Sequence, residues 1–256
     1  MSYIVNLTGN RTSKDGSIMG KVHDFKEEMA LHEQSELNVY RKHPQLTACD
    51  RRVTVYNRHT QQKVQAIMFG SNSYLGATIP EAIQKAIEVT KEFGIGSGGV
   101  PLLTGTSIYQ EELEKLIAKI SGMDDTILFS SGYTANLGVI SGLIRPNNLI
   151  IHDKLDHASL LDGTVMSGAK MIRYKHGDIN DLERLLKDNS PQYPNGILVV
   201  TDGVFSMDGD IAKLPQILEI TRKYDAILLV DEAHATGVIG DKGAGTLSHD
   251  GITDRK

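Results

Sequence analysis

Several features that would define other protein classes are scarce or missing in this chain of 256 residues. Cys49 is the only cysteine, so no intrachain disulfide can form and a reducing compartment, the cytoplasm, is expected. No apolar run approaches the roughly 20 residues of a membrane span. The start, "MSYIVNLTGNR", lacks the basic segment and apolar core of a signal peptide. The net charge of −5 argues against nucleic acid or an anionic membrane as a partner, because both bind clustered Lys and Arg.

The overall composition is that of a globular protein, with 40% hydrophobic and 23% charged residues. Residues 1–60 are polar and weakly patterned, and we expect them to form an N-terminal helical extension or arm. Within it, "VHDFKEEMALHEQSELNVYRKH" predicts an amphipathic helix with Phe25, Met29 and Leu37 roughly on one face. We expect this helix to serve in packing or in a subunit contact, and residues 61–256 to form one large domain.

The large domain is expected to begin with isolated elements. "AIMFGSNSYLG" predicts a short strand that ends in a polar turn. "PEAIQKAIEVTKEFG" predicts a helix that begins at Pro80 and stops at Gly94. The glycine-rich "GIGSGGVPLLTGTS" predicts a loop, and "YQEELEKLIAKISG" predicts the next helix.

Strands and helices then alternate along the chain. The predicted strands cover residues 126–131, 149–152, 171–174, 197–202 and 226–231, and the predicted helices cover residues 134–144, 157–168, 180–188 and 213–224. Short apolar strands between amphipathic helices predict an α/β fold with a mostly parallel sheet and helices on both faces. In such sheets, ligands bind beyond the carboxyl ends of the strands.

One of those strand ends spells a misleading motif. "ILLVDEAHATG", residues 227–237, resembles the metal-binding box of a helicase. A helicase also needs the phosphate loop G-x-x-x-x-G-K-[ST], but Gly20-Lys21 is the only Gly-Lys pair, Val22 follows it, and position 15 is Asp. A dinucleotide-binding loop is no better, because "GIGSGG" follows a predicted helix rather than a strand. An ATPase and a dinucleotide-binding fold are therefore rejected.

Two of the strand ends suggest how a different cofactor could be held. "SSGYTANLG", residues 130–138, opens a helix and could present free N–H groups to a phosphate, or could simply be a tight turn. The Asp231 carboxylate, at the end of a buried strand, could pair with a protonated ring nitrogen or cap a helix.

Three further polar residues lie near the same edge. His234 could bond a cofactor oxygen or be incidental, and His157 could stack on a planar ring or cap and pack. Ser206 could contact the cofactor or stabilise its own turn. Together, phosphate donors, a partner for a pyridinium, an imidazole and a hydroxyl suit pyridoxal 5′-phosphate (PLP).

Six motifs in this order resemble the α-oxoamine synthase family of fold-type I PLP enzymes, which has an aspartate aminotransferase-like large domain. They are "SNSYLG" (71–76), "GSGG" (96–99), "LFSSGYTAN" (128–136), "DKLDHASLLDG" (153–163), "TDGVFSMDGDIAKL" (201–214) and "LLVDEAHATGVIGDKGAG" (228–245). The resemblance implies an acyl-CoA:amino-acid C-acyltransferase that condenses a small amino acid with an acyl thioester. An aminotransferase or lyase of the same fold is the alternative.

The resemblance also implies site residues and partners. Gly132 and Tyr133 correspond to backbone donors to the PLP phosphate, His157 to the stacked histidine, and Asp231 to the partner of the ring nitrogen. Ser206 and His234 correspond to residues that bond the ring oxygen, and Asn72 to the asparagine near the amino-acid carboxylate. The "GSGG" loop reaches the neighbouring subunit's site in this family, which implies a homodimer. An acyl-carrier protein is an alternative acyl donor, and the N-terminal extension could serve it.

The sequence departs from the family pattern at its end. The lysine that binds PLP covalently lies downstream of the aspartate motif in this family, whereas this chain stops at "GITDRK". Neither Lys242 nor Lys256 has the expected context, and the small C-terminal domain is missing too. A C-terminally truncated synthase and a lysine-less, non-catalytic subunit both fit. We favour truncation, because a non-catalytic subunit would not need all of the polar site residues. The chain alone is expected to bind PLP weakly without turnover.

Overall fold

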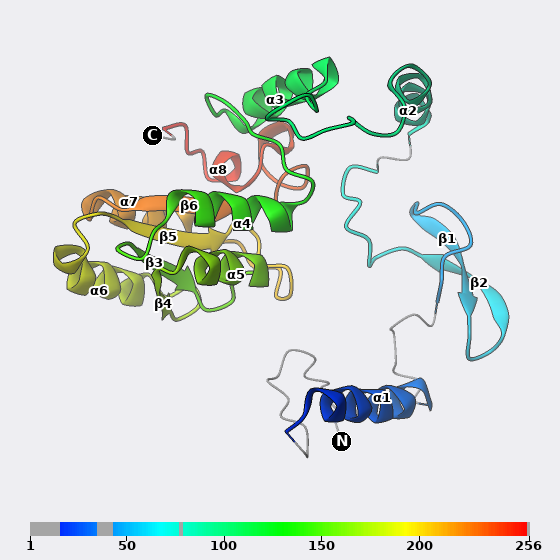
Figure 1. Cartoon of the computed structure of the whole chain (residues 1–256), viewed down its shortest axis with the longest axis horizontal. Helices are drawn as coiled ribbons and strands as arrows, with labels where there is room; N and C mark the ends of the chain where they lie inside the picture. The colour runs from blue at the N-terminus through cyan, green and yellow to red at the C-terminus, as the bar shows by residue number, and fades with distance from the viewer. Residues whose placement is uncertain (1–15, 35–42, 77–78, 255–256) are drawn as a thin grey trace. The chain divides into compact units, whose positions relative to one another are not determined.

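The chain divides into two units, Met1–Pro80 and Glu81–Lys256, in a computed structural model that describes residues 16–34, 43–76 and 79–254. The first unit contains α1 (Ile18–Gln34), β1 (Arg52–Asn57) and β2 (Gln62–Ile67), drawn in blue to cyan in Figure 1. Helix α1 covers most of the predicted amphipathic helix, but Leu37 lies outside the described residues.

Strands β1 and β2 form an antiparallel hairpin, with Val53 opposite Ala66 and Val55 opposite Val64. Strand β1 was not anticipated from the sequence, whereas β2 contains the start of the predicted strand "AIMF". The hairpin spans residue 60, and the boundary placed there between an arm and a large domain stays a prediction.

The second unit carries the alternating elements. From Pro80 onward these are α2 (Pro80–Phe93), α3 (Ile108–Ser121), α4 (Gly132–Leu143), β3 (Leu149–Asp153), α5 (Ala158–Ser167), β4 (Lys170–Tyr174), α6 (Ile179–Asn189), η1 (Ser190–Gln192), β5 (Ile197–Asp202), α7 (Leu214–Lys223), β6 (Ile227–Asp231), η2 (Asp241–Gly243) and α8 (Thr246–His249). The predicted helices and the glycine-rich loop at 94–107 are confirmed, with helix ends shifted by one or two residues. None of the helices in the described ranges combines the length and apolar character needed to cross a membrane.

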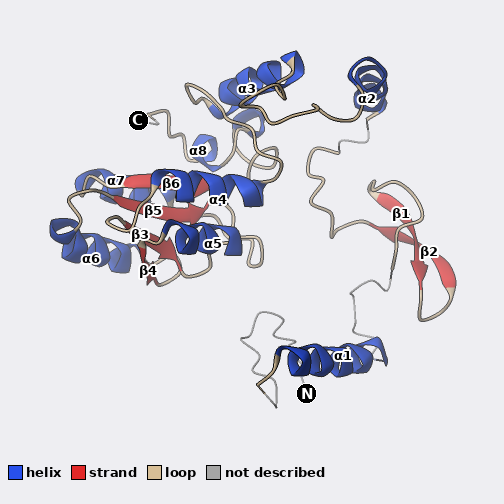
Figure 2. Cartoon of the chain, viewed as in Figure 1, coloured by secondary structure: helices blue, strands red, loops and turns tan. Residues whose placement is uncertain are grey.

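Four strands form a parallel sheet in the order β4-β3-β5-β6 (Figure 2). Their side chains alternate between two apolar cores. Leu149, Ile151 and Val199 pack with α6 and α7, whereas Ile150 and Leu198 pack with α4 and α5. Because both faces are covered, the strands read as continuous apolar runs rather than as alternating ones. The predicted α/β fold, with helices on both faces of a parallel sheet, is confirmed.

The strand predicted at residues 126–131 is wrong. Residues 126–129 form an extended loop, and the side chain of Ile127 is 73% exposed. An apolar run becomes a strand only when a neighbouring strand accepts its backbone hydrogen bonds. In the described part of the chain the sheet ends at β6, and no strand pairs with this segment.

Candidate functional site

The candidate site begins at the N-terminus of α4, where backbone N–H groups could bind an anion. Ser131 caps the helix through a reciprocal pair of bonds with Thr134. Gly132 and Tyr133 are the first two helical residues, and the first amide groups of an α-helix have no intrahelical acceptor. The positive end of the helix dipole adds to their attraction for a negative group.

The phenol of Tyr133 makes a contact that sequence reasoning did not anticipate. Its hydroxyl donates to Oδ2 of Asp162, which lies on α5. This bond, with smaller contributions from burial and the Asp162 charge, raises the pKa of Tyr133 above its ordinary value. The side chain of Tyr133 therefore ties the two helices together while its backbone stays at the helix end.

Asp231 ends β6 on the side that faces α4 and α5. Its Oδ2 accepts a hydrogen bond of 2.7 Å from Nδ2 of Asn136, and its Oδ1 accepts one of 2.9 Å from the backbone N–H of Ala233. Two donors on one carboxylate fix its orientation. The helix-cap alternative for Asp231 is wrong, because a turn rather than a helix follows the strand, and Asp231 stabilises that turn by accepting from Ala233.

His157 is the N-cap residue of α5, so the capping role is confirmed. Its Nδ1 lies 2.7 Å from Oγ of Ser159 and 3.3 Å from the backbone nitrogen of Ser159. Oγ of Ser159 lies in turn 2.9 Å from Nδ2 of Asn136. A continuous line of hydrogen bonds thus joins His157, Ser159, Asn136 and Asp231 between α4 and α5, which pack side by side (Figure 1).

A second carboxyl group, Asp202, lies beside Asp231 in the register of β5 and β6. It is 4% exposed, and its Oδ1 has no hydrogen-bond partner among the described residues. Burial and the charge of Asp231 raise the pKa of Asp202 to about 7, against a smaller opposite effect of the His157 backbone. Asp202 is therefore partly protonated near neutral pH.

The remaining predicted residues are placed as follows. Ser206 is exposed in the turn after β5, and half-buried His234 follows β6 at the same edge of the sheet. Asn72 lies in the first unit, exposed in the loop after β2. The roles of all three toward a ligand stay predictions.

A buried histidine supports the turn that leads to His157. Nδ1 of His152 lies 2.9 Å from Oδ2 of Asp156, and its Nε2 lies 2.8 Å from Oγ1 of Thr164. Burial, with the nearby Arg173 charge, lowers the pKa of His152 to about 4, and burial raises the pKa of Asp156. His152 is therefore neutral at pH 7 and acts as a structural bridge between β3 and α5.

A second histidine holds the turn that carries Ser206. Nδ1 of His176 lies 2.8 Å from Asp153 at the end of β3, and its Nε2 lies 2.7 Å from Asp210. Phe205 closes the turn by donating its N–H to the carbonyl of Asp210 and also packs edge-on against the imidazole. Burial opposes protonation of His176, but the bonds to Asp153 and Asp210 outweigh it, so its pKa is raised above 6.5.

This clamp predicts a pH dependence of stability. Because folding raises the pKa of His176, its contribution is fully present below about pH 6.5 and is lost as the pH rises through the higher folded value. We expect the free energy of unfolding, measured by urea titration, to fall as the pH rises above about 6.5. The raised pKa of Asp202 also lowers the free energy of unfolding as the pH rises toward 7. The test therefore compares the unmodified chain with His176→Gln, in which the decrease should be smaller. Parallel curves for the two proteins would contradict the clamp.

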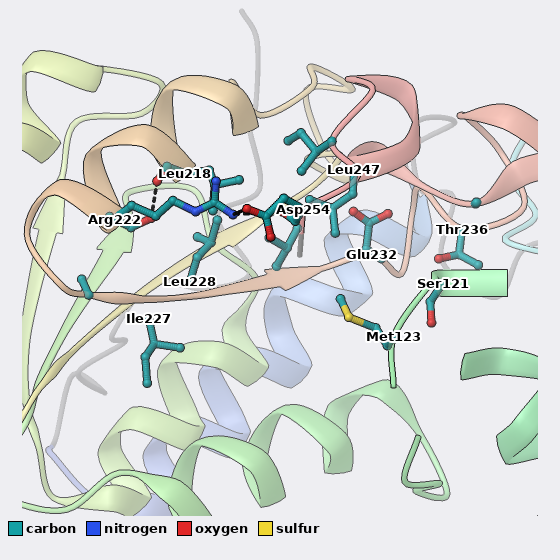
Figure 3. Close-up of a pocket in the computed structure, with 15 residues that line it drawn as sticks. Ser121, Met123, Leu218, Arg222, Ile227, Leu228, Glu232, Thr236, Leu247 and Asp254 are labelled. Carbon is teal, nitrogen blue, oxygen red and sulfur yellow. Dashed lines mark hydrogen bonds and ion pairs between the residues drawn. The ribbon is translucent and has the colours of Figure 1, made fainter. Parts of the chain in front are cut away.

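A cavity of about 370 Å³ lies on the α7 side of β6, away from this arrangement (Figure 3). Its wall includes Leu228 of β6, Glu232 directly after β6 and Met123 after α3. An ion pair of 3.0 Å between Arg222 and Asp254 also lines it. None of the predicted site residues belongs to this wall, so the cavity is separate from the candidate site.

The sequence did not single out three residues of the site, namely Asn136, Ser159 and Asp162, although all three stand inside the quoted motifs. Asp202 was expected as a polar group at the end of the predicted strand 197–202, but without a role. Asn136 could have been identified because its amide lies in the second turn of a predicted helix, near the expected strand end at Asp231. A buried amide there needs a hydrogen-bond partner.

Comparisons with known proteins agree with the α/β fold. Residues 64–254 match the protein family described as Aminotransferase class I and II. The chain is 47% identical over 191 residues to a putative 8-amino-7-oxononanoate synthase of Trichodesmium erythraeum, and 46% identical over 192 residues to a serine palmitoyltransferase of Sphingobacterium spiritivorum. These matches cover 74% and 75% of this chain but 48% of each relative, so the chain spans about half the length of the relatives it matches.

Solved structures show the same similarity. A serine palmitoyltransferase from S. paucimobilis with a bound PLP–myriocin compound has a TM-score of 0.84 and 30% identity, covering 93% of this chain and 58% of that one. The 8-amino-7-oxononanoate synthase of Francisella tularensis has a TM-score of 0.60 and 31% identity, covering 72% of this chain and 50% of that one.

Proposed function

Because the chain belongs to the aminotransferase class I and II family and carries the motifs of its α-oxoamine synthases, we propose that the full-length protein is a PLP-dependent acyl-CoA:amino-acid C-acyltransferase. The observation that carries the proposal is Asp231, a strand-end carboxylate held by two donors close to the N-terminus of α4.

The residues of this site fit PLP. The amide groups of Gly132 and Tyr133 suit the phosphate, and the Asp231 carboxylate suits the protonated ring nitrogen. When bound, PLP withdraws electrons from the Cα of the amino acid, so that this carbon can lose its proton and attack the acyl thioester. Asp231 supports this by keeping the positive charge on the ring nitrogen.

The other predicted residues complete the proposed site. His157 would lie against the ring, and Ser206 and His234 would bond the ring oxygen from the turns after β5 and β6. Asn72 would contact the carboxylate of the amino acid. We propose a homodimer in which the "GSGG" loop at 96–99 reaches the partner's site, and we place the protein in the cytoplasm.

The substrates are proposed by class. The amino acid is glycine, alanine or serine, the acyl donor is an acyl-CoA or an acylated carrier protein, and decarboxylation usually accompanies the condensation. Relatives named 8-amino-7-oxononanoate synthase and serine palmitoyltransferase support this range, because both names fall within the same family.

The full-length protein should release free thiol when a matched pair of substrates is supplied. The test is a screen of the three amino acids against acyl-CoAs of graded chain length, with thiol release followed by a colorimetric reagent. Transfer of an amino group to a 2-oxo acid, without thiol release, would indicate an aminotransferase instead. Absence of thiol release with every pair would count against the proposed synthase.

A further inference from the structure

We propose that Asn136 is a positioning residue that couples Asp231 to His157 through Ser159 and so fixes both groups in one geometry. The inference rests on the proposed function, in which Asp231 and His157 are the residues that contact the PLP ring. The hydrogen bonds that carry it are contacts within this chain and need no bound ligand.

The orientation of the Asn136 amide follows from its partner. A carboxylate such as that of Asp231 can only accept hydrogen bonds, so the amide atom 2.7 Å from its Oδ2 must be the nitrogen. The same nitrogen lies 2.9 Å from Oγ of Ser159. Its two hydrogens are therefore both used, one on each partner.

This orientation fixes the direction of every later bond. Ser159 is fully buried, and its Oγ accepts from Asn136, so its own hydrogen is left to donate to Nδ1 of His157 at 2.7 Å. The backbone N–H of Ser159 points at the same atom. Nδ1 of His157 is thus an acceptor, and the ring proton belongs on Nε2.

The packing of the two helices keeps this line intact. Gly163 of α5 lies so close to α4 that a Cβ there would come within 3.0 Å of the backbone oxygen of Asn136 and 3.2 Å of Ile140. Asn136 also sits in the middle of α4, where its backbone is fixed by the helix. The amide therefore has little freedom to turn away from its two partners.

A single substitution at Asn136 should consequently disturb both ends of the line. Asn136→Ala removes the donor to Oδ2 of Asp231 and leaves Oγ of Ser159 free to turn. Only the longer bond from the backbone N–H of Ser159, at 3.3 Å, then still favours the Nε2–H tautomer of His157. Ser159→Ala disturbs His157 while keeping the bond to Asp231. The difference between the two variants separates coupling from a local effect.

The experiment uses the 256-residue chain with nitrogen-15-labelled histidine. His157→Gln assigns the His157 signals, and the ring nitrogen shifts report the tautomer. We expect the Nε2–H tautomer in the unmodified chain, and a mixture of tautomers in both Asn136→Ala and Ser159→Ala. Controls are Asn189→Ala, a buried asparagine bonded to Leu185 on α6, and Ser141→Ala, whose hydroxyl bonds Leu137 on α4.

Equilibrium dialysis against PLP provides the second readout. We expect Asn136→Ala to raise the PLP dissociation constant about tenfold, Ser159→Ala to raise it less, and the controls to leave it unchanged. An Nδ1–H tautomer in the unmodified chain, or an unchanged tautomer in Asn136→Ala, would overturn the inference. The tautomer of the unmodified chain decides this even if a variant fails to fold. A third outcome is that the tautomers are as expected but the unmodified chain does not bind PLP. That outcome would support the coupling and count against the proposed function.

Discussion

Replacing Asp231 with asparagine is expected to lower the rate of thiol release by the full-length protein by about a thousandfold at saturating substrates. Asparagine has nearly the same shape as aspartate but carries no charge, so it cannot hold the positive charge proposed on the ring nitrogen. It would also turn an NH₂ group toward a neighbouring donor, either Asn136 or the N–H of Ala233, because both bond the carboxylate in the native site.

The matched control for this substitution is Asp188→Asn. Asp188 is an exposed aspartate of α6, and its bond of 3.4 Å to Arg184 is distant from the strand ends. We expect this control to keep the full rate, because exposed ion pairs contribute little. A rate for Asp231→Asn within threefold of the control would contradict the assignment of Asp231.

Replacing Gly245 with alanine is expected to lower the free energy of unfolding by about 3 kcal/mol, measured by urea titration and circular dichroism. Gly245 has φ 87° and ψ −169°, a backbone conformation that is essentially restricted to glycine. A Cβ would also collide with the Glu232 carboxylate, which accepts the backbone N–H of Thr246 at 2.8 Å. The substitution therefore adds strain and breaks the support of α8 together.

Gly251→Ala is the control for a positive φ without a collision. Gly251 also has a positive φ, of 67°, but a Cβ there would meet no atom within 4 Å. It should cost only the conformational strain, about 1 kcal/mol. Equal losses for the two variants would show that the contact between Gly245 and Glu232 adds nothing to stability.

The central sheet could be predicted from the sequence because its strands are buried on both faces. Residues 149–151 and 197–200 are continuous apolar runs, and a parallel sheet covered by helices on both faces is typical of such runs. Residues 126–131 are equally apolar, but a strand depends on its neighbour, which no local pattern reveals. The β1–β2 hairpin was missed because β1 lies in the segment 1–60 that was expected to be a helical arm, and because most of β2, "QKVQ", is polar.

The candidate site was predicted as a set of strand ends and helix starts, and the structure confirms that Gly132, Tyr133, His157 and Asp231 sit in such places. What the sequence could not provide is the connection between them. Asn136 and Asp231 are 95 positions apart, and their bond depends on how α4 crosses the end of β6. Likewise, the raised pKa of Asp202 arises from burial and from a neighbour on another strand, and neither is a property of its own segment.

The consecutive carboxylates at the end of β6 point to opposite sides of the sheet. Asp231 meets Asn136 on the α4 side, whereas Glu232 lines the α7-side cavity and supports Thr246. A shift of one residue in strand register exchanges the two faces. Deleting one residue from the turn before Ile227 would therefore aim Asp231 at the α7-side cavity and place a longer glutamate beside Asn136. The length of that turn thus determines which carboxylate enters the candidate site, and we expect the loop between α7 and β6 to tolerate substitutions far better than insertions or deletions.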